Sequence, residues 1–118
     1  MKIYLGTDHA GFKLKERVKQ SLLADYFEVI DYGAFQYDKQ DDYPDFIRPV
    51  AEAIAKDPEN SRGIIFGFSG QGEAMMANRF PGVRAAVYDG GSDAIIVLSR
   101  QHNNANALSF GAGFVDEG

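Results

Sequence analysis

The sequence predicts a single α/β domain over residues 1–118, built as a doubly wound, Rossmann-like sheet of five parallel strands with helices on both faces. Three observations support this prediction. The length of 118 residues suits one domain with its own core. Short apolar runs alternate with segments whose apolar residues recur at helical spacing. Most of the 13 glycines stand beside the apolar runs, where strands turn into helices.

The first half of the chain predicts two strands and two helices. Lys2–Gly6 is a short apolar run that ends in glycine, which is typical of a buried strand. Ala10–Ala24 has apolar residues at helical spacing, with lysines, glutamate and glutamine between them, and predicts a helix. Phe27–Asp31 predicts the second strand. Ala34–Asp42 is polar and aromatic and predicts a loop. A helix then begins at Pro44, which suits a first helical turn, and continues to about Lys56 before an Asp-Pro pair stops it.

The second half of the chain continues the alternation. Gly63–Gly67 is apolar at every non-glycine position and predicts a strand that is buried on both faces. A glycine-rich turn and a helix over about Gly72–Arg79 follow it. Arg84–Tyr88 predicts the fourth strand, Ser92–Arg100 a helix, and Ala107–Phe110 the fifth strand. Strands that alternate with helices in this way form βαβ units and a parallel sheet.

The charge and composition exclude several classes of protein. The chain has 12 basic and 17 acidic residues, so its net charge is −5, and it has no basic block. We therefore expect no nucleic-acid partner and no membrane surface. The lack of cysteine excludes a disulfide framework, a thiolate zinc site and a cysteine nucleophile. No signal peptide or membrane-spanning run is visible, and we expect a cytoplasmic protein.

Ligands of doubly wound sheets bind at the carboxyl ends of the strands, so the segments that follow the strands are the candidate site. They are 7–11 (TDHAG), 68–73 (FSGQGE), 89–91 (DGG) and 111–113 (GAG). Three further polar residues, 102–104 (HNN), come just before the fifth strand.

The glycine-rich turn, Gly67–Glu73, has two interpretations that the sequence leaves open. Its backbone N–H groups could converge on an anion at the start of a helix. Equally, it could be a tight turn that needs a positive φ angle. The turn matches neither the Walker loop nor the dinucleotide motif, so no nucleotide cofactor is expected. Glu73 falls in the first helical turn, where the helix dipole favours a carboxylate whatever its function.

The two histidines, His9 and His102, both fall at expected strand–helix edges, and we place both on the functional side of the sheet. They are too few for a metal site, and no metal is expected. Imidazole suits proton transfer near neutral pH better. Asp8 adds a carboxylate beside His9, although capping the next helix is its simpler role.

Two other polar clusters have simpler structural interpretations. The acidic cluster 41–45 (DDYPD) could bind a metal, but N-capping around Pro44 is favoured. The amide-rich segment 100–106 (RQHNNAN) is typical of a helix end and a turn.

Taken together and in order, five motifs resemble the ribose-5-phosphate isomerase B family, which includes the galactose-6-phosphate isomerase subunits. The motifs are 6–12 (GTDHAGF), 42–45 (DYPD), 67–73 (GFSGQGE), 77–84 (ANRFPGVR) and 102–106 (HNNAN). The resemblance covers residues 2 to about 115. It implies a metal-free enzyme that interconverts aldose and ketose phosphates through a cis-enediolate. One branch of the family uses a cysteine at the position of Gly67, and the other uses a glutamate that matches Glu73.

The resemblance also implies a role for each site residue. Glu73 would be the base, Ser69 would hydrogen-bond the sugar, and His102 would act as an acid in ring opening. Backbone amides would stabilise the enediolate oxygen. The amides are those of Phe68, Ser69, Gly70, Gln71 and Gly72. Asn103 would hold a substrate oxygen, and Asp8 and His9 would contact the sugar and its phosphate end.

Three departures from the family pattern limit this assignment. Gly113 stands where the family has a phosphate-binding arginine, and Phe68 stands where the turn has glycine. The chain ends at Gly118, before the family's C-terminal helix, so it is either an incomplete version or a divergent member. We therefore expect weak phosphate binding by this chain alone. The alternatives are a partner-dependent or non-catalytic sugar-binding subunit and an isomerase of an unphosphorylated sugar.

The resemblance implies active sites shared between two subunits. The run Ile95–Leu98 is unusually apolar for a helix in so small a domain and would be covered on more than one side. We expect a homodimer or a higher homo-oligomer, with this helix or its neighbours at the interface.

Overall fold

The computed structural model describes residues 2–34, 44–90 and 94–113. The described elements are β1 (Lys2–Thr7), the 3-10 turn η1 (His9–Gly11), α1 (Phe12–Ala24), β2 (Glu28–Asp31), α2 (Pro44–Lys56), β3 (Ser61–Gly67), α3 (Gln71–Ala77), β4 (Ala85–Tyr88), α4 (Ala94–Asn103) and β5 (Ala107–Gly111). The five strands form one parallel sheet in the order β2-β1-β3-β5-β4. This confirms the predicted fold class.

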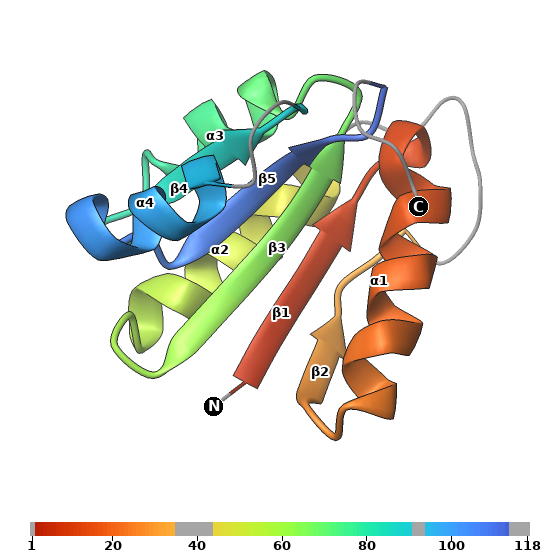
Figure 1. Cartoon of the computed structure of the whole chain (residues 1–118), viewed down its shortest axis with the longest axis horizontal. Coiled ribbons are helices and arrows are strands. Elements are labelled where there is room, and N and C mark those ends of the chain that lie inside the picture. Colours follow the sequence, from red (N-terminus) through yellow and green to blue (C-terminus); the bar gives the residue numbers. More distant parts are fainter. Residues whose placement is uncertain (1, 35–43, 91–93, 114–118) are drawn as a thin grey trace.

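The helices lie on both faces of the sheet (Figure 1). Helices α1 and α4 cover one face, and α2 and α3 cover the other. The strand order requires this arrangement, because right-handed crossovers that run in opposite directions along a sheet place their helices on opposite faces. The connection that leaves β1 runs toward one edge of the sheet, and the connection that leaves β3 runs toward the other. The crevice expected for a ligand therefore lies at the carboxyl ends of these two strands.

Two apolar clusters fill the space between the helices and the sheet. On one face Ile47, Val50 and Ile54 of α2 pack against Ile65 of β3. On the opposite face Leu14 of α1 belongs to the second cluster, which is built on β1 and β3. Both faces of the central strands are therefore covered with apolar side chains, as the Gly63–Gly67 run predicts. No helix of the described part of the chain is long and apolar enough to cross a membrane.

Several boundaries differ from the sequence prediction by one to three residues, and three of these differences have a clear physical reason. The helix predicted from Ala10 begins only at Phe12, because Asp8 caps a separate 3-10 turn. Strand β3 begins at Ser61, two residues early, because β1 supplies a pairing partner along its whole length. Helix α4 continues through Asn103, so His102 lies in its last turn and not in the predicted turn.

Some predictions lie outside the described residues. These are all of the predicted loop Ala34–Asp42 except Ala34, most of the acidic cluster 41–45, the predicted helix start at Ser92, and residues 114–118.

Candidate active site

The carboxyl ends of β1, β3 and β5 are joined by hydrogen bonds. The Thr7 hydroxyl at the end of β1 donates to the carbonyl of Phe66 in β3 at 3.2 Å. At the ends of β3 and β5, the Ala112 N–H donates to Gly67 O at 2.7 Å, and the Gly113 N–H donates to Phe68 O at 2.9 Å. The segments that follow these strands therefore meet at one edge of the sheet, as predicted.

The glycine-rich turn is held in shape by β5. Gly70 has a φ angle of +79°, in the left-handed region that favours glycine, so the tight-turn interpretation is confirmed. The buried Ser109 hydroxyl of β5 donates to Gly70 O at 2.7 Å. A Cβ atom on Gly111 would lie 2.7 Å from the carbonyl carbon of Ser69, so the turn packs directly on the end of β5. The Ser69 hydroxyl accepts the Gln71 N–H at 3.2 Å as α3 begins.

Glu73 is a buried carboxylate in the first turn of α3. Burial raises its pKa, the charge of Asp8 adds to this, and hydrogen bonds from the backbone N–H groups of Glu73 and Gly70 oppose it without cancelling it. Glu73 is the third residue of α3 and accepts the N–H of the N-cap residue Gly70, which is one half of a capping box; Gly70 has no side chain to make the other half. Glu73 therefore helps to start the helix and is also a stronger base than an ordinary glutamate.

The carboxylate of Glu73 lies against the backbone of Gly67. A Cβ atom on residue 67 would stand 2.5 Å from Oε2 of Glu73 and nearer still to Oε1 and Cδ. Only glycine at position 67 leaves room for the carboxylate. A side chain at position 67 and this placement of Glu73 are mutually exclusive.

Asp8 and His9 follow β1 on the same edge. The Asp8 carboxylate accepts the Ala10 N–H at 3.0 Å, which confirms its capping role. Asp8 is also near enough to Glu73 for its charge to contribute to the raised pKa of Glu73. Both Asp8 and His9 are half-buried and line this edge.

His102 and Asn103 lie at the opposite edge of the sheet. Both are exposed and belong to the last turn of α4, just before β5 begins. Arg84 Nε at the start of β4 donates to Asn104 O at 2.6 Å, which ties the end of α4 to the amino ends of the strands. Within one chain the placement of His102 on the functional side is therefore wrong, because a helix that returns from β4 to β5 ends where β5 starts, whereas His9 follows β1 on the functional side as predicted. The length of β5 separates His102 from the glycine turn, roughly 15 Å.

The amide-rich segment 100–106 forms a helix end and a turn, as its composition predicts. Asn104 adopts a left-handed φ angle of +51° after α4. Asn106 is buried, accepts the Arg84 N–H at 2.8 Å and donates to Gly82 O at 2.8 Å. Among the described residues, no group of three or more histidine, aspartate or glutamate side chains could hold a metal ion.

Sequence reasoning missed Lys15, a fully buried lysine next to the site. Its ammonium donates to Asp31 at 2.8 Å and to the carbonyl of Ala34 at 2.6 Å. Ala34 in turn donates its N–H to Thr7 O at 2.8 Å, so Lys15 fixes the backbone beside the end of β1. Burial alone would raise the pKa of Asp31, but hydrogen bonds from Lys15, Gly33 and Lys19 outweigh it and the pKa is lowered. No local signal marks Lys15, because its partners lie 16 and 19 residues away.

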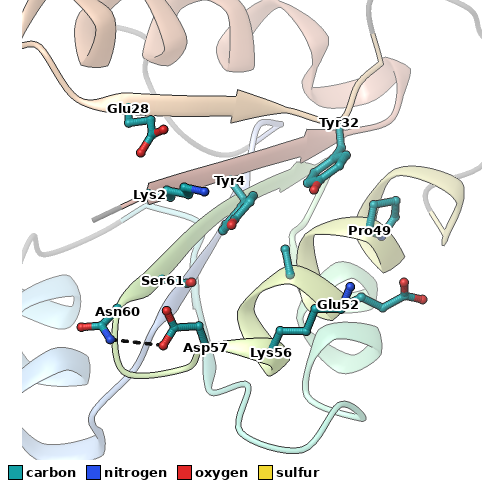
Figure 2. A pocket seen from close by; sticks show the side chains of 11 residues that line it. Lys2, Tyr4, Glu28, Tyr32, Pro49, Glu52, Lys56, Asp57, Asn60 and Ser61 are labelled. Carbon is teal, nitrogen blue, oxygen red and sulfur yellow. Dashed lines mark hydrogen bonds between the residues drawn. The ribbon is translucent and has the colours of Figure 1, made fainter.

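A cleft of about 470 Å³ lies elsewhere, between α2 and the edge strand β2 (Figure 2). Its floor carries Tyr4 and Tyr32, whose rings stack with centroids 5.9 Å apart. Lys2, Glu28 and Ser61 line it from the amino ends of the strands. No sequence motif marks these residues, and the cleft does not include the glycine turn or Glu73.

A doubly wound sheet whose carboxyl edge holds a basic, buried carboxylate beside a glycine-rich turn is typical of α/β enzymes that move protons on small molecules. The comparisons with known proteins identify the family. The model described as Ribose/Galactose Isomerase matches residues 3–118, and the chain belongs to this family.

Relatives and solved structures agree with this assignment. Ribose-5-phosphate isomerase B of Mycobacterium tuberculosis is 44% identical over 111 residues, which are 94% of this chain and 67% of that protein. The crystal structure of ribose-5-phosphate isomerase B from Mycoplasma genitalium with bound ribulose-5-phosphate matches with a TM-score of 0.94 and 37% identity, over 98% of this chain and 75% of that one. The Clostridium thermocellum structure matches with a TM-score of 0.90 and 41% identity, over 99% of this chain and 76% of that one.

Proposed function

We propose that this protein is an aldose–ketose isomerase of a sugar phosphate, of the ribose 5-phosphate/ribulose 5-phosphate type. The observation that carries the proposal is the buried Glu73 carboxylate, whose pKa is raised, beside the glycine turn. The relatives support the substrate class, since they are ribose-5-phosphate isomerases B and one solved relative holds ribulose-5-phosphate. A screen of pentose and hexose phosphates for isomerisation tests the proposal.

Glu73 is the base in this proposal. Its carboxylate removes the proton from the carbon next to the substrate carbonyl, and the electron pair moves to the carbonyl oxygen, which gives a cis-enediolate. The hydroxyl proton on the deprotonated carbon passes to the former carbonyl oxygen, and Glu73 returns its proton to the former carbonyl carbon. Aldose and ketose therefore interconvert with no net gain or loss of protons. The raised pKa favours the first step, because a stronger base holds the proton better at neutral pH.

The glycine turn stabilises the enediolate oxygen. The backbone amides that we assign to this role are those of Phe68, Ser69, Gly70, Gln71 and Gly72. Charge that develops near fixed N–H groups needs no solvent reorganisation, which lowers the barrier. The Ser69 hydroxyl binds a sugar oxygen, and Asp8 and His9 contact the sugar from the end of β1.

A second copy of the chain completes the site. His102 and Asn103 lie too far from Glu73 to act within one chain, so we assign ring opening and substrate binding to these residues of a partner subunit. The exposed apolar side chains of α4 support an interface close to them. Ile95 is 46% exposed, Val97 53% and Leu98 47%, which is unusual for a helix that faces only water.

Mixing two inactive variants tests the shared site. In a hybrid dimer of Glu73→Gln and His102→Ala chains, one of the two sites has an intact Glu73 and an intact His102. Random exchange makes half of the dimers hybrid, so about a quarter of the wild-type activity should return. Mixing Glu73→Gln with the double variant Glu73→Gln/His102→Ala is the matched control and should restore none. A lack of recovery, or a monomer mass by light scattering at micromolar concentration, would contradict the shared site.

An isomerase of an unphosphorylated sugar is the second candidate. It is favoured by Gly113, which stands where the resemblance implies a phosphate-binding arginine. Calorimetry with ribose 5-phosphate and with ribose separates the two candidates, because only a phosphate site makes the first ligand bind much more tightly. A partner-dependent sugar-binding subunit would bind the sugar and show no turnover when assayed alone.

A further inference from the structure

The side chain of Phe68 is exposed at the edge of the sheet that carries the candidate site. Phe68 is the first residue after β3, and its side chain is 59% exposed. Its α-carbon is next to that of Gly67, against which the Glu73 carboxylate lies, so about 3.8 Å separates the two α-carbons. The backbone that carries the ring is therefore one residue from the position of the base.

The ring of Phe68 packs over Gly113. A Cβ atom on Gly113 would stand 2.7 Å from Cδ1 and Cζ of Phe68 and nearer still to Cε1. The Gly113 N–H also donates to Phe68 O at 2.9 Å, so the two residues are held together by backbone and ring. The absence of a side chain at position 113 is what leaves room for the ring. The two residues form one structural unit.

The charges around Phe68 do not favour a phosphate. In the described segments that follow the strands (8–11, 32–34, 68–73, 89–90 and 112–113), there is no lysine or arginine. Asp8, Glu73 and Asp89 are acidic, and His9 is the one residue there that can become cationic. A dianionic phosphate calls for charge-assisted donors. An apolar ring beside acidic and amide groups instead suits the carbon skeleton and hydroxyls of a sugar.

We propose that Phe68 is a specificity-determining residue whose ring stacks on the C–H face of the sugar. The inference rests on the proposed isomerase function and deepens it, because it names the part of the substrate that this edge selects. The C–H bonds of a sugar face carry partial positive charge, and the face of an aromatic ring is negative, so the two attract. The ring is rigid and already held by Gly113, so little conformational entropy is lost on binding. Selection at this edge is then for the sugar and not for the phosphate.

Two substitutions of similar size separate stacking from simple packing. Phe68→Leu keeps an apolar side chain and removes the aromatic face, whereas Phe68→Tyr keeps that face. We expect Phe68→Leu to raise KM for ribose 5-phosphate by about three- to tenfold with kcat little changed, and Phe68→Tyr to stay near the wild type. Met75→Ala is the matched control. Met75 is another large exposed apolar side chain, 67% exposed on α3, and its loss should leave KM unchanged.

Binding of ribose and of ribose 5-phosphate, measured by calorimetry in the Glu73→Gln background to prevent turnover, shows which part of the substrate the ring contacts. The inference expects Phe68→Leu to weaken both ligands by the same factor. Gly113→Ala should reproduce the effect by displacing the ring, and should add nothing in a Phe68→Leu chain.

Three results would overturn the inference. These are an unchanged KM and Kd in Phe68→Leu, weaker binding of the phosphorylated ligand alone, and a change in oligomeric mass that accompanies the loss of binding. Absence of turnover by the wild-type chain on every sugar phosphate would count against the proposed function instead. The calorimetric comparison of ribose with ribose 5-phosphate would still decide the role of Phe68.

Discussion

Gly67→Ala is the substitution whose effect the structure predicts most directly. It adds one methyl group at the end of β3, where Gly67 does not have a left-handed φ angle, so alanine meets no backbone strain. The new Cβ would lie 2.5 Å from Oε2 of Glu73, whereas ordinary contacts begin at 3.4 Å. The carboxylate must therefore move by about 1 Å, and a misplacement of that size at a reacting group costs about 10²-fold in rate.

The fold should survive this change. The moved carboxylate can lose its hydrogen bond from the Gly70 N–H, and the loss of a helix cap costs about 1 kcal/mol. A domain of this size tolerates such a loss, so the circular dichroism spectrum should be unchanged and the melting temperature only slightly lower. The expected result is a kcat about a hundredfold below wild type in an isomerisation assay with ribose 5-phosphate.

A double-mutant cycle with Glu73→Gln distinguishes a displaced base from a general disturbance. If Gly67→Ala acts through Glu73, adding it to a Glu73→Gln chain should lower kcat little further. Two penalties that multiply in the double variant would refute the reasoning. A Gly67→Ala enzyme with kcat within about threefold of wild type would refute it as well.

The remaining predictions concern Glu73 and the buried lysine. Glu73→Gln should lower turnover about a hundredfold or more. Because the folded-state pKa of Glu73 is raised, its ionised form destabilises the fold, so Glu73→Gln should melt at a higher temperature than wild type at pH 7. This gain in melting temperature should fade as pH drops through the raised pKa of Glu73. An unchanged melting temperature at pH 7 would contradict the burial argument. For the same reason, the acid limb of kcat/KM in the wild type should have its midpoint above 4.5, the ordinary value for glutamate, and a midpoint at or below it would exclude Glu73 as the titrating base. Lys15→Met should destabilise the fold by about 3–5 kcal/mol in denaturant melts, because Asp31 remains buried and loses its main partner. Lys19→Met is the control for Lys15→Met, since Lys19 is 27% exposed and contacts Asp31 without reaching Ala34. We expect Lys19→Met to lower the free energy of unfolding by about 1 kcal/mol or less. Equal losses of stability in both variants would rule out the role given to Lys15. The stabilisation from Asp31 is present above its unfolded-state pKa and should be lost as pH falls through its lowered folded-state pKa, so wild type should lose more stability in acid than Lys15→Met does.

The sequence by itself determined the features that depend on neighbouring residues. Apolar periodicity predicts the five strands and four α-helices of the described residues to within a few residues, and it does not predict the short 3-10 turn. The glycine turn predicts the left-handed residue found at Gly70, and Asp8 predicts the cap found before α1. The predictions of the turn and of the cap succeed because hydrogen bonds and steric limits within a few residues decide turns and caps. The motifs also bring together Asp8, Glu73 and the turn, because parallel strands end at one edge.

Only the tertiary structure decided which distant residues touch. Helical spacing puts Lys15 among the polar positions of its helix, yet contacts with Asp31 and Ala34 bury it completely. His102 is close in sequence to β5 but lies at the edge of the sheet away from Glu73, because the direction of a returning helix decides where it ends. The overlap of position 67 with the Glu73 carboxylate and of position 113 with the Phe68 ring depends on ångström-scale packing between separate elements. Periodicity does not encode such contacts, since they arise when strands and turns far apart in the chain close on one another.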